Sequence, residues 1–254
     1  ANYQGRGAAA GCVPANPFGT NSFTPDVVGY VIGQSYAEST LEQRTAGASV
    51  QVDLFDTWAG TVSMAGGVDY REESVDQIAD PVAQFTTPAF QTGGWQFGNR
   101  RPLVGSYDVT EFFAEALVPL AKDAFLAKSL DLNAAVRSTD YSTSGNVVSW
   151  KAGLTYEPIT GLRLRANRSR DIRAANLVEL YTPGVSIVGA IVDYGRPGNP
   201  SSSVPTTTIG NPELEPELAD TTTIGVVWEP SFTSGLSMSV DYYDIDLQDA
   251  IGSL

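Results

Sequence analysis

Five arginines recur close together in the second half of the chain: Arg163, Arg165, Arg168, Arg170 and Arg173. Guanidinium groups bind carboxylates and phosphates through paired hydrogen bonds, so such a run could guide an anionic ligand. Arginines on a strand also form ion pairs with Asp or Glu on neighbouring strands, and we favour this structural interpretation. Arg168, Arg170 and Arg173 are kept as the candidate ligand-binding residues of the run.

Aromatic residues in long segments rich in Gly, Pro and polar residues form a second set of candidates: Trp95, Phe97, Tyr181 and Tyr194. Their rings could stack on the sugar rings of a carbohydrate or on a siderophore. Aromatic residues also close loops by packing on one another, and this interpretation is favoured over ligand binding. The four residues complete the predicted ligand-binding set.

Four aspartates near the end of the sequence suggest a site for a hard cation: Asp241, Asp244, Asp246 and Asp249. Their spacing does not match an EF-hand loop, which also needs a central Gly and a terminal Glu. We interpret them as the solvated end of a strand. No metal site and no cofactor is therefore predicted.

No combination of residues in the chain predicts catalysis. The sequence contains no His, which is the commonest general base and metal ligand. It contains neither a Gly-x-Ser-x-Gly elbow nor a Walker loop. Glu72 and Glu73 are adjacent, so on a strand they point to opposite faces and do not form a carboxylate pair. We predict that the protein is not an enzyme.

The composition limits the class of protein. The chain has 254 residues with 42% hydrophobic and 17% charged residues, which is too apolar for a disordered protein. Its net charge of −14 argues against a nucleic-acid partner, which needs a basic surface. The longest apolar runs, such as residues 116–121, are too short for a membrane helix of about 20 residues. The sequence starts without Met or a secretion signal, so we expect a mature or excised chain.

Alternating apolar and polar residues predict strands on which the arginines and carboxylates would lie. Between residues 129 and 172, three successive segments each place Leu, Val, Ala or aromatic residues on one face and charged residues on the other. We also expect one helical turn in residues 25–31. In total the alternation predicts eight strands, at residues 38–55, 61–73, 106–118, 129–136, 148–156, 162–167, 224–228 and 236–242.

The connections between these strands tend to alternate between short and long. Residues 74–105 and 173–219 form two long loops on one side, whereas the connections on the other side are all short. Outer-membrane barrels have this asymmetry, with aromatic residues where strands leave the lipid, here Trp150, Tyr156, Trp228 and Tyr242. The predicted fold is all-β, an antiparallel up-and-down transmembrane β-barrel segment of about eight strands. A soluble antiparallel sheet with one wet face fits the alternation equally well and remains open.

Several segments resemble the barrel region of TonB-dependent outer-membrane receptors. No segment is specific alone, but the order of Arg-x-Arg, Glu-Leu and Asn-Pro-x-Leu-x-Pro-Glu before a strand is a fairly specific combination. The similar segments are residues 11–14 (GCVP), 16–19 (NPFG), 52–60 (VDLFDTWAG), 67–73 (GVDYREE), 106–120 (SYDVTEFFAEALVPL), 150–154 (WKAGL), 162–170 (LRLRANRSR), 176–180 (NLVEL) and 211–220 (NPELEPELAD). They are distributed over nearly the whole chain.

The resemblance implies a receptor for uptake of a bulky nutrient, an oligosaccharide or a siderophore-like ligand, in the outer membrane of a Gram-negative bacterium. It implies that residues 1–37 form an extracellular loop region and residues 38–254 part of the barrel. The plug domain and the C-terminal strands of such receptors are absent here. Expected partners are outer-membrane lipid, the ligand and, through the missing plug, the TonB protein. It also implies that Cys12 pairs with a cysteine upstream of this chain. The alternative function is a soluble all-β carbohydrate-binding or carbohydrate-active module.

Overall fold

The computed structural model describes residues 13, 15, 18–20, 22–85, 93–95, 99–233 and 235–252. The predictions for Cys12 and Phe97 therefore fall on residues outside the described ranges. The chain divides into two compact units, Ala1–Glu38 with Ala79–Arg101 and Ser39–Ile78 with Pro102–Leu254. In the described ranges, no helix has both the length and the apolar character needed to cross a bilayer.

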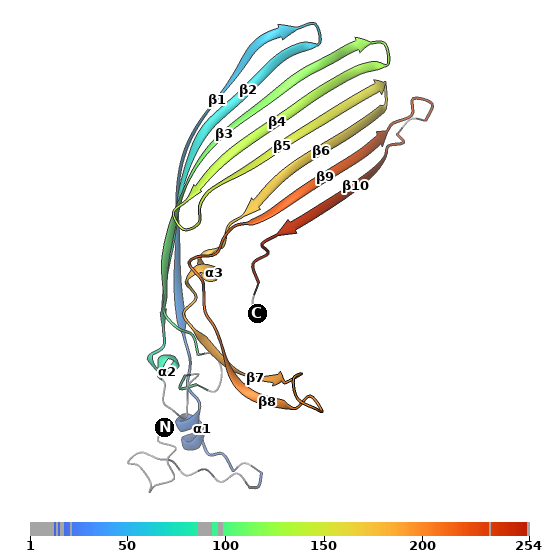
Figure 1. Ribbon diagram of the computed structural model, residues 1–254. Helices are drawn as coiled ribbons and strands as arrows, with labels where there is room; N and C mark the ends of the chain where they lie inside the picture. Colours follow the sequence, from blue (N-terminus) through green and yellow to red (C-terminus); the bar gives the residue numbers. More distant parts are fainter. Residues whose placement is uncertain are drawn as a thin grey trace. The chain divides into compact units, whose positions relative to one another are not determined.

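The second unit is built on an eight-stranded sheet, shown in Figure 1 as strands that run side by side. The strand order is β1-β2-β3-β4-β5-β6-β9-β10, and every pair from β2 to β10 is antiparallel. β1 and β10 are the two edges of this sheet. The strands are β1 (Ala37–Thr57), β2 (Gly60–Ala79), β3 (Leu103–Ala124), β4 (Ala127–Tyr141), β5 (Gly145–Ile159), β6 (Leu162–Arg173), β9 (Glu217–Trp228) and β10 (Met238–Gln248).

The prediction of an antiparallel sheet with eight strands is confirmed, and the strands are longer than the alternation indicates. β3, for example, begins at Leu103 and ends at Ala124, whereas the predicted strand covers residues 106–118. The additional residues of β3 are 103–105 (LVG) and 119–124 (PLAKDA), in which apolar residues are adjacent and do not alternate with polar ones, although their backbones remain paired. The predicted strand limits were therefore the limits of the apolar pattern.

Short turns connect the strands at one end of the sheet, which we call the turn end. They comprise residues 58–59, 125–126, 160–161 and 229–237. The β5–β6 turn depends on Gly161, which has a positive φ of 85°. A Cβ at this position would lie 2.2 Å from the carbonyl oxygen of Glu229, whose N–H donates to the Gly161 carbonyl at 2.7 Å. Only glycine fits this approach of two neighbouring turns.

The opposite end of the sheet, the loop end, carries connections 80–102, 142–144 and 174–216. The last of these is not the structureless loop that the sequence suggests. It contains helix α3 (Leu177–Tyr181) and a two-stranded hairpin of β7 (Val185–Val192) and β8 (Ser201–Thr208). The hairpin escapes sequence analysis because its apolar residues fill one strand and Ser and Thr fill the other, without alternation.

The first unit contains two short helices, α1 (Pro25–Val31) and α2 (Pro81–Gln84). Each begins with a proline at its first position, after a residue whose side chain accepts a hydrogen bond from the helix N-terminus. For α1 the capping residue is Thr24, and for α2 it is Asp80. The helical turn predicted at residues 25–31 is thus confirmed.

Candidate functional site

The register of the strands assigns each side chain of the sheet to one of two faces. One transverse row contains Met64, Ala116, Ala134 and Ala152, and the row one residue further along contains Ala65, Glu115, Ala135 and Lys151. We call the face of the first row the apolar face and that of the second row the charged face. The strands from β2 to β5 keep this assignment, as the alternation of Ser129 to Ile172 predicts.

Large side chains on the apolar face are exposed. The side chain of Phe112 is 61% exposed, that of Ile224 is 56% exposed and that of Val240 is 73% exposed. A soluble sheet buries such a surface against a second layer, because contiguous apolar patches of this kind are rare on soluble monomers. Their exposure indicates a face built for hydrocarbon contact.

The apolar face changes to polar along a line that crosses the strands obliquely. On β2 the continuous apolar run of this face ends at Tyr70, which is followed by Glu72, and on β10 it ends at Tyr242, which is followed by Asp244. The strand register places Asp244 in the same transverse row as Met64, which is eight residues from Glu72 on β2. The line therefore shifts by eight residues over the six strand-to-strand steps from β2 to β10. With about 3.4 Å per residue and about 4.8 Å between strands, the line makes an angle of roughly 43° with the perpendicular to the strands.

If this line lies parallel to a membrane surface, the strands are tilted by the same angle from the membrane normal. Strands of outer-membrane barrels are tilted by roughly 35–45°. Aromatic residues lie near the limits of the band, with Trp150 and Tyr242 toward the loop end and Tyr156 and Trp228 toward the turn end. Trp228 also contacts Phe232 of the β9–β10 turn, with ring centroids 6.0 Å apart. The band is therefore organised as a membrane-crossing wall.

Ion pairs between strands hold several cations of the charged face in place. Arg165 on β6 donates two hydrogen bonds to Asp241 on β10, of 2.8 and 2.6 Å. Arg137 on β4 donates to Glu111 on β3 at 3.0 Å, and its guanidinium carbon lies 5.1 Å from the centre of the Phe113 ring. The two charges of each pair neutralise each other, so these arginines do not offer an unpaired charge to a ligand.

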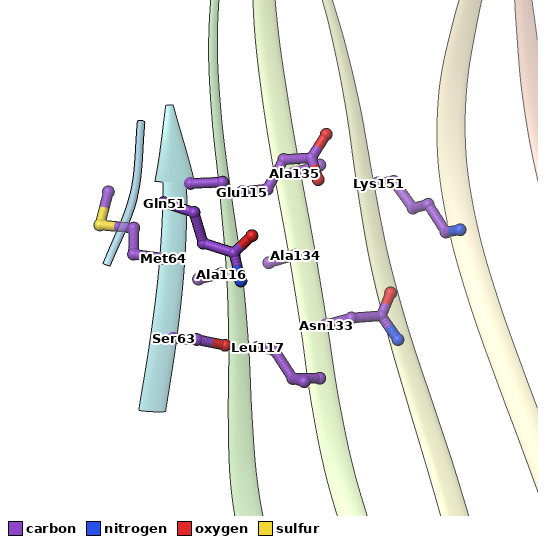
Figure 2. Close-up of a pocket in the computed structure, with 11 residues that line it drawn as sticks. Gln51, Ser63, Met64, Glu115, Ala116, Leu117, Asn133, Ala134, Ala135 and Lys151 are labelled. Atoms are coloured by element: carbon purple, nitrogen blue, oxygen red, sulfur yellow. The ribbon is translucent and has the colours of Figure 1, made fainter. Parts of the chain in front are cut away.

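Lys151 differs from these arginines. It lines a hollow of about 380 Å³ on the charged face, together with Gln51, Glu115 and Asn133 (Figure 2). It also lines an adjoining hollow of about 360 Å³. Among the described residues, no carboxylate lies within ion-pair distance of its ammonium group. The middle of the charged face thus presents hydrogen-bonding groups to water.

At the loop end the charged face carries a small hydrophobic core, which we call the loop core. Leu177 and Leu180 of α3 are 5% and 2% exposed and pack on residues of β2, β3 and β4. The strand residues of the loop core are Val75, Leu103, Tyr107, Val109 and Tyr141. Helix α3 is therefore fixed on this face of the sheet.

Arg173 secures the same helix by hydrogen bonds. Its guanidinium donates twice to Glu217 at the start of β9, both at 2.7 Å, and twice to Glu179 of α3, both at 3.1 Å. Glu179 in turn accepts from the N–H of Asn176, which caps α3. Glu217 also accepts from the N–H of Ile251 beyond β10, at 2.7 Å. One side chain thus links β6, α3 and β9.

The three arginines predicted to bind a ligand are not brought together. Arg168 and Arg170 lie on the apolar face, just beyond the band, and Arg173 lies on the charged face. Arg170 forms a bidentate pair with Asp220, of 2.9 and 2.7 Å, and Arg168 donates to Thr222. A single basic ladder is excluded because successive residues of a strand point to opposite faces.

The predicted aromatic residues also have different surroundings. The indole N–H of Trp95 donates to Asp80 at 3.2 Å, and its ring lies where a Cβ on Gly33 would be. The hydroxyl of Tyr181 donates to the carbonyl of Ser106 at 2.8 Å. The side chain of Tyr194, in the turn between β7 and β8, is 81% exposed. Of the three described residues, Tyr194 is exposed, whereas Trp95 and Tyr181 are partly buried.

The four aspartates do not form a cation site. Asp241 pairs with Arg165, whereas Asp244 and Asp246 lie on the other face. Within the described ranges, no group of three or more His, Cys, Asp or Glu residues is arranged to hold a metal ion. Glu72 and Glu73 lie on opposite faces, as predicted.

The residues of the loop core, and Glu217, which pairs with Arg173, were not among the predicted site residues. A signal for them exists on β3, where Tyr107 and Val109 occupy the same alternating positions as Glu111 and Glu115. Apolar residues at the alternating positions that elsewhere on the strand carry charges indicate that another segment covers that part of the face.

Comparison with protein families gives one match, to the model described as TonB dependent receptor-like, beta-barrel, over residues 3–254. No curated protein matches the chain. Among solved structures, a variant of the ferric enterobactin receptor PfeA of Pseudomonas aeruginosa is similar, with 21% sequence identity and a TM-score of 0.62. The match covers 83% of this chain and 27% of that chain. The siderophore receptor PirA of Acinetobacter baumannii is 18% identical, with a TM-score of 0.61. This match covers 84% of this chain and 28% of that chain.

The siderophore receptor PirA of Pseudomonas aeruginosa is 16% identical, with a TM-score of 0.60 over 84% of this chain and 33% of that one. At these identities the similarity establishes the fold. The chain spans about a quarter to a third of the length of these solved receptors. An eight-stranded sheet with two open edges is what such a portion of a barrel looks like alone.

Proposed function

The chain belongs to the TonB-dependent receptor-like β-barrel family, and we propose that it forms part of the wall of an outer-membrane receptor that takes up a bulky nutrient. The observation that carries this proposal is the oblique apolar band. It gives the strands the tilt of a membrane barrel and separates a lipid-facing surface from a charged one. The charged face would then line the aqueous interior.

In this proposal the parts of the chain have separate tasks. The apolar band contacts lipid of the outer membrane, and the charged face contacts water and the plug domain, through which the TonB protein supplies energy. The segments at the loop end of the sheet face the exterior and meet the ligand, and residues 1–37 form an extracellular loop region. The ligand is an oligosaccharide or a siderophore-like molecule, and the solved receptors of similar fold are siderophore receptors by their descriptions.

The test uses the complete receptor gene in its own bacterium. We expect a deletion strain to lose growth on one ligand from a panel of ferric siderophores and oligosaccharides, and to regain it with the intact gene. A strain without TonB should show the same loss. The receptor should fractionate with the outer membrane. Recovery of the protein in the soluble fraction, with growth unchanged on every ligand, would contradict the proposal.

A further inference from the structure

Arg168 is a cation on the apolar side of the sheet. It pairs with Ala152 on β5, a residue of the apolar face, so its side chain leaves the sheet on that face, where it is exposed. The apolar run of β6 ends at Ala166, the preceding residue on the same face. A charge on the lipid side of a barrel costs free energy wherever water is excluded. Arg168 therefore needs water or a counter-charge at its level.

The apolar band reaches further toward the loop end on the strand beside Arg168. Ala152 on β5 lies level with Arg168. From there the apolar run of β5 continues through Trp150 to Val148 and becomes polar at Asn146. Trp150 is 37% exposed and Val148 is 44% exposed, so both present apolar surface on this side of the sheet. Arg168 thus lies at the edge of the band, where lipid gives way to water in the proposed membrane position.

The chain supplies no negative partner for Arg168. Among the described residues, no carboxylate lies within ion-pair distance of its guanidinium, which donates to the neutral hydroxyl of Thr222 on β9. Asp220 is bound by Arg170 through two hydrogen bonds, of 2.9 and 2.7 Å. Asp244 lies in the same row but two strands away on β10, a distance of about 10 Å at the usual strand spacing. Arg168 is thus an unpaired cation at the boundary of the band.

Arg168 and Thr222 together have the chemistry of an oxyanion site. The hydroxyl of Thr222 accepts a hydrogen bond from Nη1 of Arg168, so the hydroxyl hydrogen can still be donated to another group. The guanidinium keeps further N–H donors in one plane, an arrangement that matches two oxygens of a phosphate. Lipid phosphates lie in the polar layer between the acyl chains and water. We propose that Arg168 and Thr222 bind the phosphate of a lipid headgroup on the outside of the barrel wall.

The surroundings of Arg168 favour a lipid over a free anion. Acyl chains attached to the phosphate would contact the apolar face, including Trp150 on the neighbouring strand. Elsewhere along the same boundary, Asp140 on β4 and Asp244 on β10 repel a phosphate. Phosphate should therefore gather at Arg168. This inference rests on the proposed function, because that function places the apolar band in a membrane.

Lipid binding to the purified full-length receptor in detergent tests the site. The probes are phosphatidic acid and diacylglycerol with identical acyl chains, which differ only in the phosphate, and native mass spectrometry measures the fraction of receptor that carries each lipid. We expect the receptor to retain phosphatidic acid in preference to diacylglycerol. Arg168→Gln should weaken binding of phosphatidic acid by about fivefold, the effect of one arginine near an anionic lipid surface. Excess inorganic phosphate should not displace the lipid, since it gains no contact with the apolar face.

Arg163→Gln is the matched control. Arg163 lies on the charged face of the same strand, so its replacement changes the net charge equally and should leave the binding of phosphatidic acid unchanged. Thr222→Val keeps the shape of the side chain but removes the hydroxyl, and it should weaken binding less than Arg168→Gln. Arg168→Lys keeps the charge and should restore part of the binding.

Three results would overturn the proposal. They are equal retention of the two lipids, equal effects of Arg168→Gln and Arg163→Gln, and displacement of phosphatidic acid by inorganic phosphate. The measurements need neither the nutrient nor the TonB protein. A negative result would therefore leave the growth and fractionation tests of the receptor function unaffected.

Discussion

The charged face of the sheet has two different environments along the same strands. In its middle, Glu115 and Lys151 line an open hollow and face water. At the loop end, Val109 and Tyr141 lie on the same face but are buried, because α3 packs over them. The strands continue from one environment to the other without a break in hydrogen bonding.

The difference shows that the strand alone does not decide whether its face is exposed to water. Exposure also depends on whether another segment covers that face. In the middle, no described segment of the chain covers the face, and polar side chains there line an open hollow. At the loop end a five-residue helix and Arg173 convert the same face into a small core. Four experiments test this comparison, and their effects should decrease in the order given.

Leu180→Ala tests whether α3 is held mainly by burial. Leu180 is almost fully buried, and removing such a leucine costs about 2–5 kcal/mol through lost contacts and the cavity left behind. We expect faster hydrogen exchange in residues 174–182 of the full-length receptor. Val178→Ala on the same helix is the control, since Val178 is 58% exposed. Equal effects of the two substitutions would show that the loop core does not stabilise α3.

Ala134→Lys and Ala135→Lys compare the two faces at one level of the sheet. Ala134 lies in the apolar band, where a lysine at the middle of a bilayer costs roughly 2–4 kcal/mol in a barrel. Ala135 lies on the charged face between Glu115 and Lys151, so a lysine there should cost much less. Folding titrations of the full-length receptor in lipid vesicles measure both free energies. A larger loss for Ala135→Lys would reverse the assignment of the faces.

Gly105→Ala tests the fit of the α3 segment on β3. A Cβ at this position would lie 2.2 Å from the ring of Tyr181, so the ring must move and lose its bond to Ser106. Overpacking of this kind costs about 1–3 kcal/mol. The loss in unfolding free energy should shrink when Tyr181→Ala removes the ring. An unchanged loss in the double variant would place the strain elsewhere.

Tyr194→Ala should have the smallest effect on stability. Its side chain is exposed at the tip of the hairpin, and surface substitutions of this kind usually change the unfolding free energy by less than about 0.5 kcal/mol. Tyr181→Ala is the comparison, since Tyr181 packs on the loop core. Binding of the ligand found by the growth panel should weaken in Tyr194→Ala if the predicted role of Tyr194 holds. A stability loss equal to that of Tyr181→Ala would mean that the tip is packed on the barrel.

The sequence predicted the main sheet, whereas the contacts of the candidate site residues became visible only in the structure. The eight strands of the sheet follow from alternation at residues such as Leu130, Leu132 and Leu154, since a period of two is a local property of the backbone. The hairpin β7–β8 lacks that period and was missed. The aromatic candidates were chosen by their position in loops and the arginines by their close spacing, and most of those described form hydrogen bonds within the chain. Trp95, Tyr181 and Arg173 have partners that lie far from them in sequence or in a segment read as loop.

The residue sequence by itself determined which side chains share a face, because neighbouring residues of a strand point in opposite directions. It also determined where the apolar band ends on each strand. Only the tertiary structure decided how the strands are offset, and therefore that these ends form one oblique line across six strand-to-strand steps. It also decided that Leu180 and Arg173 meet partners on other strands, because such contacts depend on which segment folds back over the sheet.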